Sequence, residues 1–510
     1  MDSQMPTSPE EILDEDQLKQ KAAEESRLNK PITAKFLIKF TIPTIFAFVV
    51  MGIFGMIDGI FASRGIGIEA LAAVNYVMPF FTFSMAIGAM LSMGGCALVV
   101  KKKGKKLNQE ARENFSLLTL TIFSISASIA LIGWFLRRPL LRLLGTDNEV
   151  FDLALSYIQP LILMMPFIMV GMFLIQFLIA EGRPVLGMFA SISGAIVSTS
   201  LNAIFIFVFD FGVMGLALAT GIGYAVPTIL GLIYFTFNRK GTIFFVKPKW
   251  DIKCIGRSSF NGISEAITMM SVTVLIIIMN NVISDIVGFE GVAAAGMVMA
   301  LQQIFASLFF GYASGIAPVV SYNYGKKLKY GRDSEVGQER HNNLRKLFKK
   351  SLVIISVLSL LALGLAQAFA SLLVQIYVSP GYMLPLEYGF VPGETYYIDG
   401  RYVTNVNMHA MAVRGLRIVS AGFLLMGFNV FATAWFTAFN NGLVSGIMSF
   451  IQTFVLSSTA LLTLPRLLDL DGVWMSLPIV EILSVGITIF FLIKMGKRYG
   501  YLNIPAKGID

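Results

Sequence analysis

The chain has 510 residues, of which 55% are hydrophobic and only 14% are charged, and its formal net charge is +9. Because soluble proteins carry about 25% charged residues, this composition excludes an ordinary soluble globular protein and indicates a multi-span membrane protein. The positive charge is typical of basic loops at an anionic membrane surface and requires no nucleic acid partner.

The chain begins with a polar, acidic stretch, residues 1–32, which lacks the apolar core of a cleavable signal peptide. We expect this stretch to be a cytoplasmic tail. The two cysteines and two histidines show no metal-ligand spacing, so we expect no metal site and no cofactor.

Twelve apolar segments follow the tail, and each is long enough to cross a bilayer as a helix. Backbone groups in hydrocarbon must be hydrogen-bonded within their own segment, and the short alternating units of a membrane barrel are absent. We therefore expect an all-α integral membrane protein. The segments cover approximately 36–63, 70–100, 115–136, 150–180, 185–209, 213–237, 256–284, 292–321, 348–376, 414–439, 443–465 and 473–494.

The first segment has one charged residue between Phe40 and Ser63, which is Asp58. A carboxylate there is costly in hydrocarbon, so it should face a protein interior or a wet cavity, and it is by default a functional candidate. Burial disfavours its ionised form, so Asp58 can hold a proton near neutral pH. Gly55, on the same face, is expected to let a neighbouring helix approach closely. The alternative is an acid that only fixes helix packing.

The seventh segment carries Glu265 one turn after its start. This acid is either favoured by the helix dipole, or it is a cavity anion that pairs with a cationic substrate. We select four candidate substrate-binding residues from the polar groups of the second half, while the alternative for each amide is a bond to a neighbouring helix. They are Glu265, Asn280, Gln302 and Asn429.

Lysine and arginine concentrate in the loops after segments 2, 6 and 8 and in the tail after segment 12. Because such residues mark the cytoplasmic side, we expect a multi-pass protein of the cell membrane with both termini in the cytoplasm. The turn after segment 3 is an exception to this pattern, with Arg137, Arg138 and Arg142 on the outer side.

An internal repeat divides the chain. The offset of 221 residues that takes Gly67 to Gly288 also pairs residues 94 and 104 with residues 315 and 325, all of them glycines. Further on, Gly182 matches Gly442 at an offset of 260 residues. The larger second offset places an insertion before segment 10. An even number of spans in each half gives both halves the same orientation, related by a pseudo-twofold axis along the membrane normal.

The repeat predicts two six-helix lobes with a transport site between them. The expected divisions are an N-lobe at 33–237, a cytoplasmic linker at 238–255, a C-lobe at 256–496 with an outer insertion at about 380–412, and a cytoplasmic tail at 497–510.

With this repeat in place, three regions resemble the multidrug and toxic compound extrusion (MATE) family. They are Pro43–Ala62, then Ala180–Pro184 with Leu201–Phe207 and Gly212–Thr220, and finally Gly315–Gly325. The resemblance implies two lobes around a V-shaped cavity that rock between outward-open and inward-open states. It also implies export of amphipathic, often cationic compounds, including antibiotics, driven by inward Na⁺ or H⁺.

The resemblance assigns a cation-coupling pocket in the first lobe to Asp58, Ser198, Asn202 and Thr220. Their oxygens are of the kind that coordinate Na⁺, and one carboxylate with neutral oxygens suits one monovalent ion or one proton. Asn202 departs from the family, which has a second carboxylate there. The family's acid on segment 10 has no counterpart, and the charge at the start of that segment is Arg414.

Together these features predict a monomeric secondary antiporter that exports amphipathic, cationic small molecules across the lipid bilayer. The alternative is a flippase for lipids or lipid-linked oligosaccharides of the same superfamily. An ATP-driven pump is disfavoured because no phosphate-binding GxxxxGK[ST] motif is present. We expect no enzyme, because no catalytic cluster of His, Asp or Ser stands near one leaflet.

Overall fold

The computed structural model describes residues 28–144, 146, 150–239, 241–287, 289–331, 334–377, 395–398, 401–404 and 408–502. In this part of the chain, eleven helices are long and apolar enough to cross a membrane. A twelfth span is formed by two helices, α12 (Met408–Ser420) and α13 (Phe423–Ala438), bent by 53° at their junction. The predicted all-α membrane fold is confirmed.

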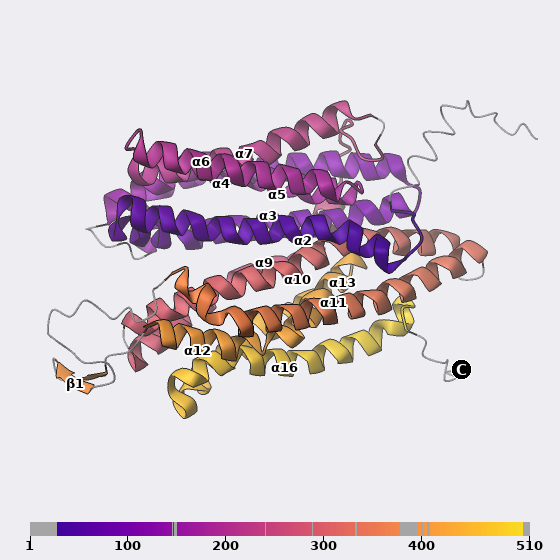
Figure 1. Cartoon of the computed structure of the whole chain (residues 1–510). Helices are drawn as coiled ribbons and strands as arrows, with labels where there is room; N and C mark the ends of the chain where they lie inside the picture. Colours follow the sequence, from indigo (N-terminus) through magenta and orange to yellow (C-terminus); the bar gives the residue numbers. More distant parts are fainter. Residues whose placement is uncertain are drawn as a thin grey trace, which may run out of the picture.

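Figure 1 shows two bundles of helices lying side by side. The first bundle comprises α2 (Ala34–Ile60), α3 (Ile68–Gly104), α4 (Asn108–Leu143), α5 (Phe151–Ala180), α6 (Pro184–Phe207) and α7 (Gly212–Phe237), with the π-helix η1 (Phe61–Ile66) continuing α2. The second comprises α8 (Ile252–Asn261), α9 (Ile263–Ile286), α10 (Phe289–Tyr330), α11 (Glu335–Gln375), α12, α13, α14 (Gly442–Ser449), the π-helix η2 (Phe450–Leu456), α15 (Ser457–Thr463) and α16 (Pro465–Tyr499).

Most of the predicted insertion at 380–412 lies outside the described residues, as do most of the two tails. The described part contains an antiparallel pair of strands, β1 (Thr395–Ile398) and β2 (Arg401–Thr404), in which Thr395 pairs with Thr404. The start of α12 follows at Met408.

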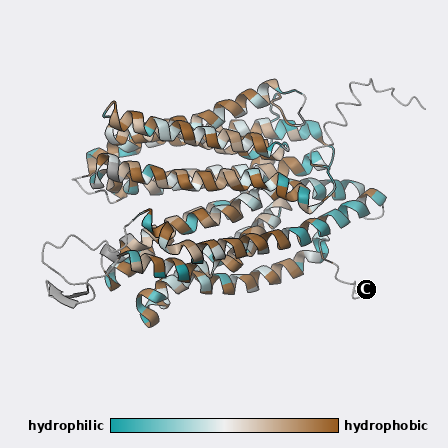
Figure 2. Cartoon of the chain, viewed as in Figure 1, coloured by the Kyte–Doolittle hydropathy of each residue, from teal (hydrophilic) through white to brown (hydrophobic). Residues whose placement is uncertain are grey.

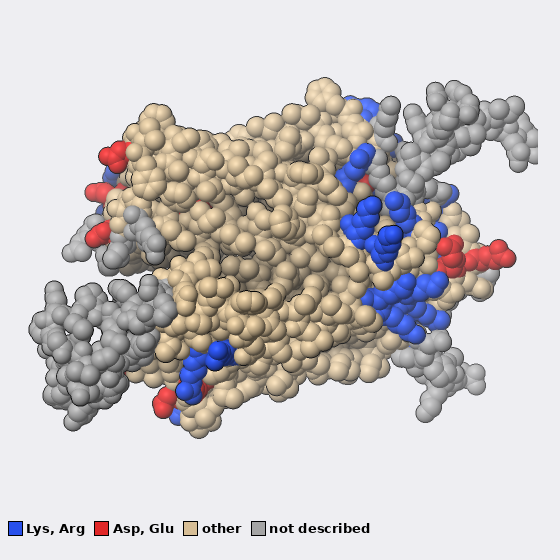
Figure 3. All heavy atoms as spheres, viewed as in Figure 1, with Lys and Arg blue, Asp and Glu red and all other residues tan. Residues whose placement is uncertain are grey.

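The bundles have apolar flanks and polar ends, as Figure 2 shows. Lysine and arginine gather at one end in Figure 3. We call this the basic end. It contains the last turns of α3, with Lys101–Lys103, and of α10, with Lys327 and Lys329. The helix α2 therefore runs from the basic end toward the opposite end, with Asp58 in its last turn.

The two bundles meet backbone to backbone near the basic end. A Cβ atom added to Gly104 of α3 would lie 2.3 Å from the carbonyl oxygen of Tyr322 on α10. One added to Gly325 of α10 would lie 2.2 Å from the carbonyl oxygen of Lys101 on α3. Because real side chains do not come so close, only glycine allows this crossing.

The glycines paired by the sequence repeat occupy corresponding places in the two bundles. A Cβ atom on Gly94 of α3 would lie 2.6 Å from the backbone nitrogen of Gly262, before α9. One on Gly315 of α10 would lie 3.2 Å from Cγ2 of Thr41 on α2. Thr41 and Gly262 are themselves separated by the repeat offset of 221 residues. The same pattern of close contacts is thus used twice across the interface.

The glycines of α2 differ in how closely another helix approaches them. A Cβ atom on Gly52 would lie 2.9 Å from Ser307 Oγ on α10. One on Gly55 or Gly59 would meet nothing within 4 Å. The prediction that Gly55 permits a close helix approach is therefore wrong, because no neighbouring helix is close to that position. The close approach is made at Gly52, one turn earlier.

The segment between α7 and α8 is hydrogen-bonded to the first bundle through Glu181. This residue follows α5 and is 2% exposed. Its carboxylate accepts hydrogen bonds from the backbone nitrogens of Thr242 (2.6 Å) and Ile243 (3.1 Å) and from Thr242 Oγ1 (2.5 Å). Lys103 Nζ, also buried, lies 3.2 Å from Oε2. A buried carboxylate with this many donors is well compensated for its lost hydration.

Replacing Glu181 by Gln is expected to release this segment from the first bundle. Removing one partner of a buried ion pair costs about 3–5 kcal/mol, because the other charge is left uncompensated. We expect limited trypsin digestion to cut at Arg239 or Lys249 at least about tenfold faster than in the unmodified protein, since 1.4 kcal/mol already gives a factor of ten. The control is Glu110→Gln, which breaks an exposed pair with Lys102 worth less than about 1 kcal/mol. Equal cleavage rates in both variants would contradict the role of Glu181.

Candidate functional site

Asp58 is held by side chains from two other helices of the first bundle. Asn202 Nδ2 on α6 donates to Asp58 Oδ1 at 2.7 Å. Thr220 Oγ1 on α7 lies 3.2 Å from Asp58 Oδ2 and also 3.0 Å from its own helix carbonyl at Leu216. Asn202 and Thr220 are buried and Asp58 is half-buried. The structure therefore brings three of the four predicted coupling residues together.

Ser198 lies one turn before Asn202 on α6 and is fully buried, packed against Gly223 of α7. No hydrogen bond joins it to Asp58. Both Ser198 Oγ and Asn202 Oδ1 are buried without a hydrogen-bond partner in the described part of the chain. Unpaired buried acceptors are uncommon in proteins. These two oxygens lie on neighbouring turns of α6, and Asn202 is the residue that reaches the carboxylate of Asp58.

The local backbone at Asp58 is unusual. α2 changes into the π-helix η1 directly after this turn, and the nitrogen of Phe61 bonds to the carbonyl oxygens of both Asp58 and Ile57. Single π-helical turns inside longer helices occur frequently at functional sites. The wider turn is placed next to the only acid of this span.

A small cavity lies one turn from Asp58 between α2, α5, α6 and α7. Its volume of about 20 Å³ is enough for about one water molecule. It is lined by Met51, Phe54, Ile175, Ser191, Gly194, Ala195, Gly223, Tyr224 and Pro227. Asp58 itself does not line the cavity, which lies one helical turn nearer the basic end.

The candidate substrate-binding residues of the second bundle do not form one cluster. Glu265, in the first turn of α9, and Asn280 and Gln302 are half-buried, and their side chains make no hydrogen bond among the described residues. Asn429 is fully buried on α13. Its amide is bonded inside the bundle, to Glu481 of α16 (Nδ2 to Oε2, 2.6 Å). A role for these residues in substrate binding remains a prediction.

Glu481 is a buried acid that the sequence reading missed. It lies in the twelfth span and is 3% exposed. The sequence carries the same signal at Glu481 as at Asp58, namely one acid in an apolar stretch. Glu481 is the only charged residue between Asp471 and Lys494. An isolated acid inside an apolar segment is a functional candidate by default.

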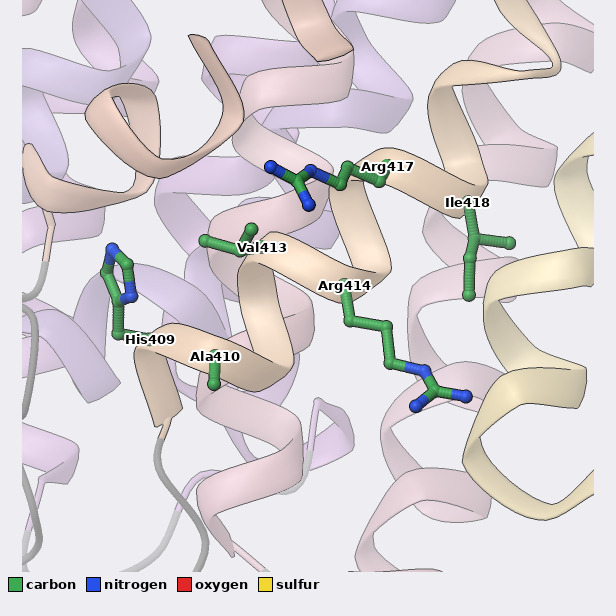
Figure 4. A pocket seen from close by; sticks show the side chains of 6 residues that line it. All are labelled: His409, Ala410, Val413, Arg414, Arg417 and Ile418. Carbon is green, nitrogen blue, oxygen red and sulfur yellow. The ribbon is translucent and has the colours of Figure 1, made fainter. Parts of the chain in front are cut away.

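A groove of about 490 Å³ lies along α12 at the end opposite the basic end. Figure 4 shows the six residues that line it, which are His409, Ala410, Val413, Arg414, Arg417 and Ile418. The guanidinium group of Arg414 points toward α16, where it pairs with Asp471 (Nε to Oδ1, 3.0 Å). Arg417, which the sequence reading did not single out, lies one turn further along the helix. The groove is basic.

The paired bundles, the apolar spans and the acid held between three spans define an α-helical membrane transporter. The family model described as MatE matches residues 43–204. The multidrug export protein MepA of Staphylococcus saprophyticus is 23% identical over 455 residues, which is 88% of this chain and 90% of the relative. MepA of Staphylococcus haemolyticus is 23% identical over 469 residues, which is 91% of this chain and 94% of the relative.

A solved multidrug resistance MATE family transporter in an outward-facing conformation has the same fold, with a TM-score of 0.81 and 19% sequence identity, over 94% of this chain and 99% of that one. The chain is similar to MATE family transporters in both sequence and fold. The resemblance found in the sequence is confirmed.

Proposed function

We propose that the protein is a secondary antiporter that exports amphipathic, cationic small molecules in exchange for Na⁺ or H⁺. The observation that carries this proposal is the acid site at Asp58, where the carboxylate accepts from Asn202 and Thr220 and where α6 carries two buried oxygens without a partner, on Ser198 and Asn202. The relatives named as multidrug exporters support the direction of transport and the class of substrate.

The Asp58 site can link the binding of either ion to the arrangement of the helices around it. In the ionised state the carboxylate accepts from Asn202 and Thr220. A proton on Oδ2 would replace the interaction with Thr220, whose hydroxyl would remain bonded to Leu216. A Na⁺ ion would instead require Asn202 to turn its amide, so that Oδ1 and Ser198 Oγ join the carboxylate. Either change alters the contacts among α2, α6 and α7, which links ion binding to helix arrangement.

The proposed orientation places the basic end in the cytoplasm, with the protein in the cell membrane as a monomer. The N-lobe at 33–237 and the C-lobe at 256–496 would then rock about the glycine crossing of Gly104 and Gly325, and the linker at 238–255 would lie on the cytoplasmic side. Glu265, on the bundle that faces Asp58, would be the anion that pairs with a cationic substrate.

Purified protein in lipid vesicles tests this function. A Na⁺ gradient and a pH gradient are imposed separately, and the movement of ethidium is followed by fluorescence. We expect one of the two gradients to drive ethidium transport and its collapse by an ionophore to stop it. Ethidium movement that ignores both gradients would refute coupling to either ion.

The flippase alternative draws support from the groove on α12, because the exposed Arg417 would favour an anionic headgroup, whereas the charge of Arg414 is offset by Asp471. The same vesicles decide between the two functions. A fluorescent anionic phospholipid is placed in one leaflet and its transfer is followed by quenching with dithionite. Transfer that depends on the protein and is lost in Arg417→Gln would favour the flippase.

A further inference from the structure

We propose that Glu481, together with Asn429 and Gln452, forms a second proton-binding site, inside the second bundle and separate from Asp58. This site goes beyond the proposed export function and does not depend on it, because a proton can bind whether or not substrate moves. Nothing in the family resemblance assigns a role to Glu481.

The site is built from three separate spans. Asn429 Nδ2 of α13 donates to Glu481 Oε2 at 2.6 Å. It also lies 3.2 Å from the backbone oxygen of Glu481. Gln452 Nε2 of η2 donates to Oε2 at 3.3 Å. Thr488 Oγ1 of α16 donates to Asn429 Oδ1 at 2.7 Å, which fixes the Asn429 amide with its nitrogen toward the acid. Asn429, Glu481 and Thr488 are almost fully buried.

The atoms around the acid suit a proton and not a metal ion. Every side-chain atom bonded to Oε2 is an N–H donor, and the nearby oxygen of Asn429 is occupied by Thr488. A cation would need oxygens in these places. No group of three or more His, Cys, Asp or Glu residues in the described part of the chain could hold a metal.

Glu481 has no ion-pair partner among the described residues. Six elements make the main contacts with α16, and α10 contacts only its far end at Tyr499. Four of them, α13, α14, η2 and α15, contain no charged residue. The charged or titratable groups of the other two are Glu265 and Asp285 on α9 and His409, Arg414 and Arg417 on α12. None forms an ion pair with Glu481, so its charge is compensated by amide hydrogen bonds alone.

Protonation would change what the acid needs from its neighbours. An ionised carboxylate only accepts hydrogen bonds, whereas a protonated one also donates. Gln452 can meet both requirements, because its amide can turn and present Oε1. Ser484 Oγ, one turn along α16, is buried without a partner and offers a second acceptor. The residue that would turn lies in η2, so the protonation state of Glu481 is linked to the π-helical part of the eleventh span.

This link has a parallel in the first bundle, where η1 directly follows Asp58. In each bundle, one acid inside a span is thus associated with one π-helix. π-helical turns within longer helices occur frequently at functional sites. We infer that, in each bundle, protonation of this acid changes the conformation of the π-helix associated with it.

Infrared difference spectroscopy tests the second site without transport. The purified protein is reconstituted in lipid and spectra at acid and neutral pH are subtracted, so that the carbonyl band reports protonated carboxyl groups. We expect Glu481→Gln to remove one component of this band and Asp58→Asn to remove a different one. The matched control is Glu69→Gln, at an exposed acid in the first turn of α3, which should leave both components in place.

A second variant keeps the acid and removes a donor. In Gln452→Leu, the component assigned to Glu481 should titrate about one pH unit higher, because the ionised form loses one hydrogen bond. The proposal is overturned if the carbonyl band of Glu481→Gln matches that of the unmodified protein, or if Gln452→Leu leaves the titration unchanged. Loss of the Asp58 component alone would leave the export function standing and remove the second site.

Discussion

Replacement of Asp58 by Asn is expected to reduce ion-driven ethidium transport to the level of vesicles that contain no protein. The amide has the same shape as the carboxylate and can still bond to Asn202 and Thr220, so the fold should persist. It can neither carry a proton nor neutralise a cation, so the ion gradient is no longer linked to the bundles. Vesicle transport assays with each gradient imposed separately measure this loss.

Two control variants test whether the loss is specific to Asp58 and which ion drives transport. Asp152→Asn makes the same chemical change at an exposed position at the start of α5 and should transport normally. Ser198→Ala removes a buried oxygen that has no partner, so it should weaken transport driven by Na⁺ and spare transport driven by H⁺. Full ion-driven transport by Asp58→Asn would exclude the first-bundle acid as the coupling group.

Adding a single methyl group at the glycine crossing is expected to open the basic end. In Gly104→Ala or Gly325→Ala, the new Cβ atom would meet a backbone carbonyl oxygen at 2.3 or 2.2 Å, so α3 and α10 must separate. Overpacking of this kind costs about 1–3 kcal/mol. Since 1.4 kcal/mol corresponds to a factor of ten, the population of the conformation opened at this end should rise about tenfold or more.

Cys96 provides a native reporter for that opening. It lies on α3, is 2% exposed, and contacts Gln176, which in turn accepts a hydrogen bond from Ser314 of α10 at 2.7 Å. In a Cys254→Ser background, labelling of Cys96 by a water-soluble maleimide should be about tenfold faster in either glycine variant. Gly364→Ala on α11, where a methyl group meets nothing within 4 Å, is the matched control. Unchanged labelling in the crossing variants would show that this contact does not hold the bundles together.

The spans could be predicted because apolar length alone determines them, and Asp58 could be predicted because a single acid interrupts the first one. The partners of a buried acid are harder to predict. Glu481 is bonded to Asn429 and Gln452, which are 52 and 29 residues away in the chain, so only the packed bundle shows that these groups belong together. A sequence read for charge alone detects the acid but not its donors.

The error at Gly55 has a related cause. Residue spacing shows which positions share a face of a helix, but not how far the neighbouring helix follows that face. α10 lies close to α2 at Gly52, whereas no helix lies close to Gly55. The bend between α12 and α13 was also missed, because no proline lies at the junction, which contains Ala421 and Gly422.

The close contact of α10 with α2 at Gly52 lies between Asp58 and the basic end. Because Asp58 is on the side of this contact away from the lysines, we expect an ion to reach the acid from the opposite end. In the proposed orientation, with the basic end in the cytoplasm, the driving ion would reach Asp58 from outside. Its release inward would then require the crossing of Gly104 and Gly325 to open.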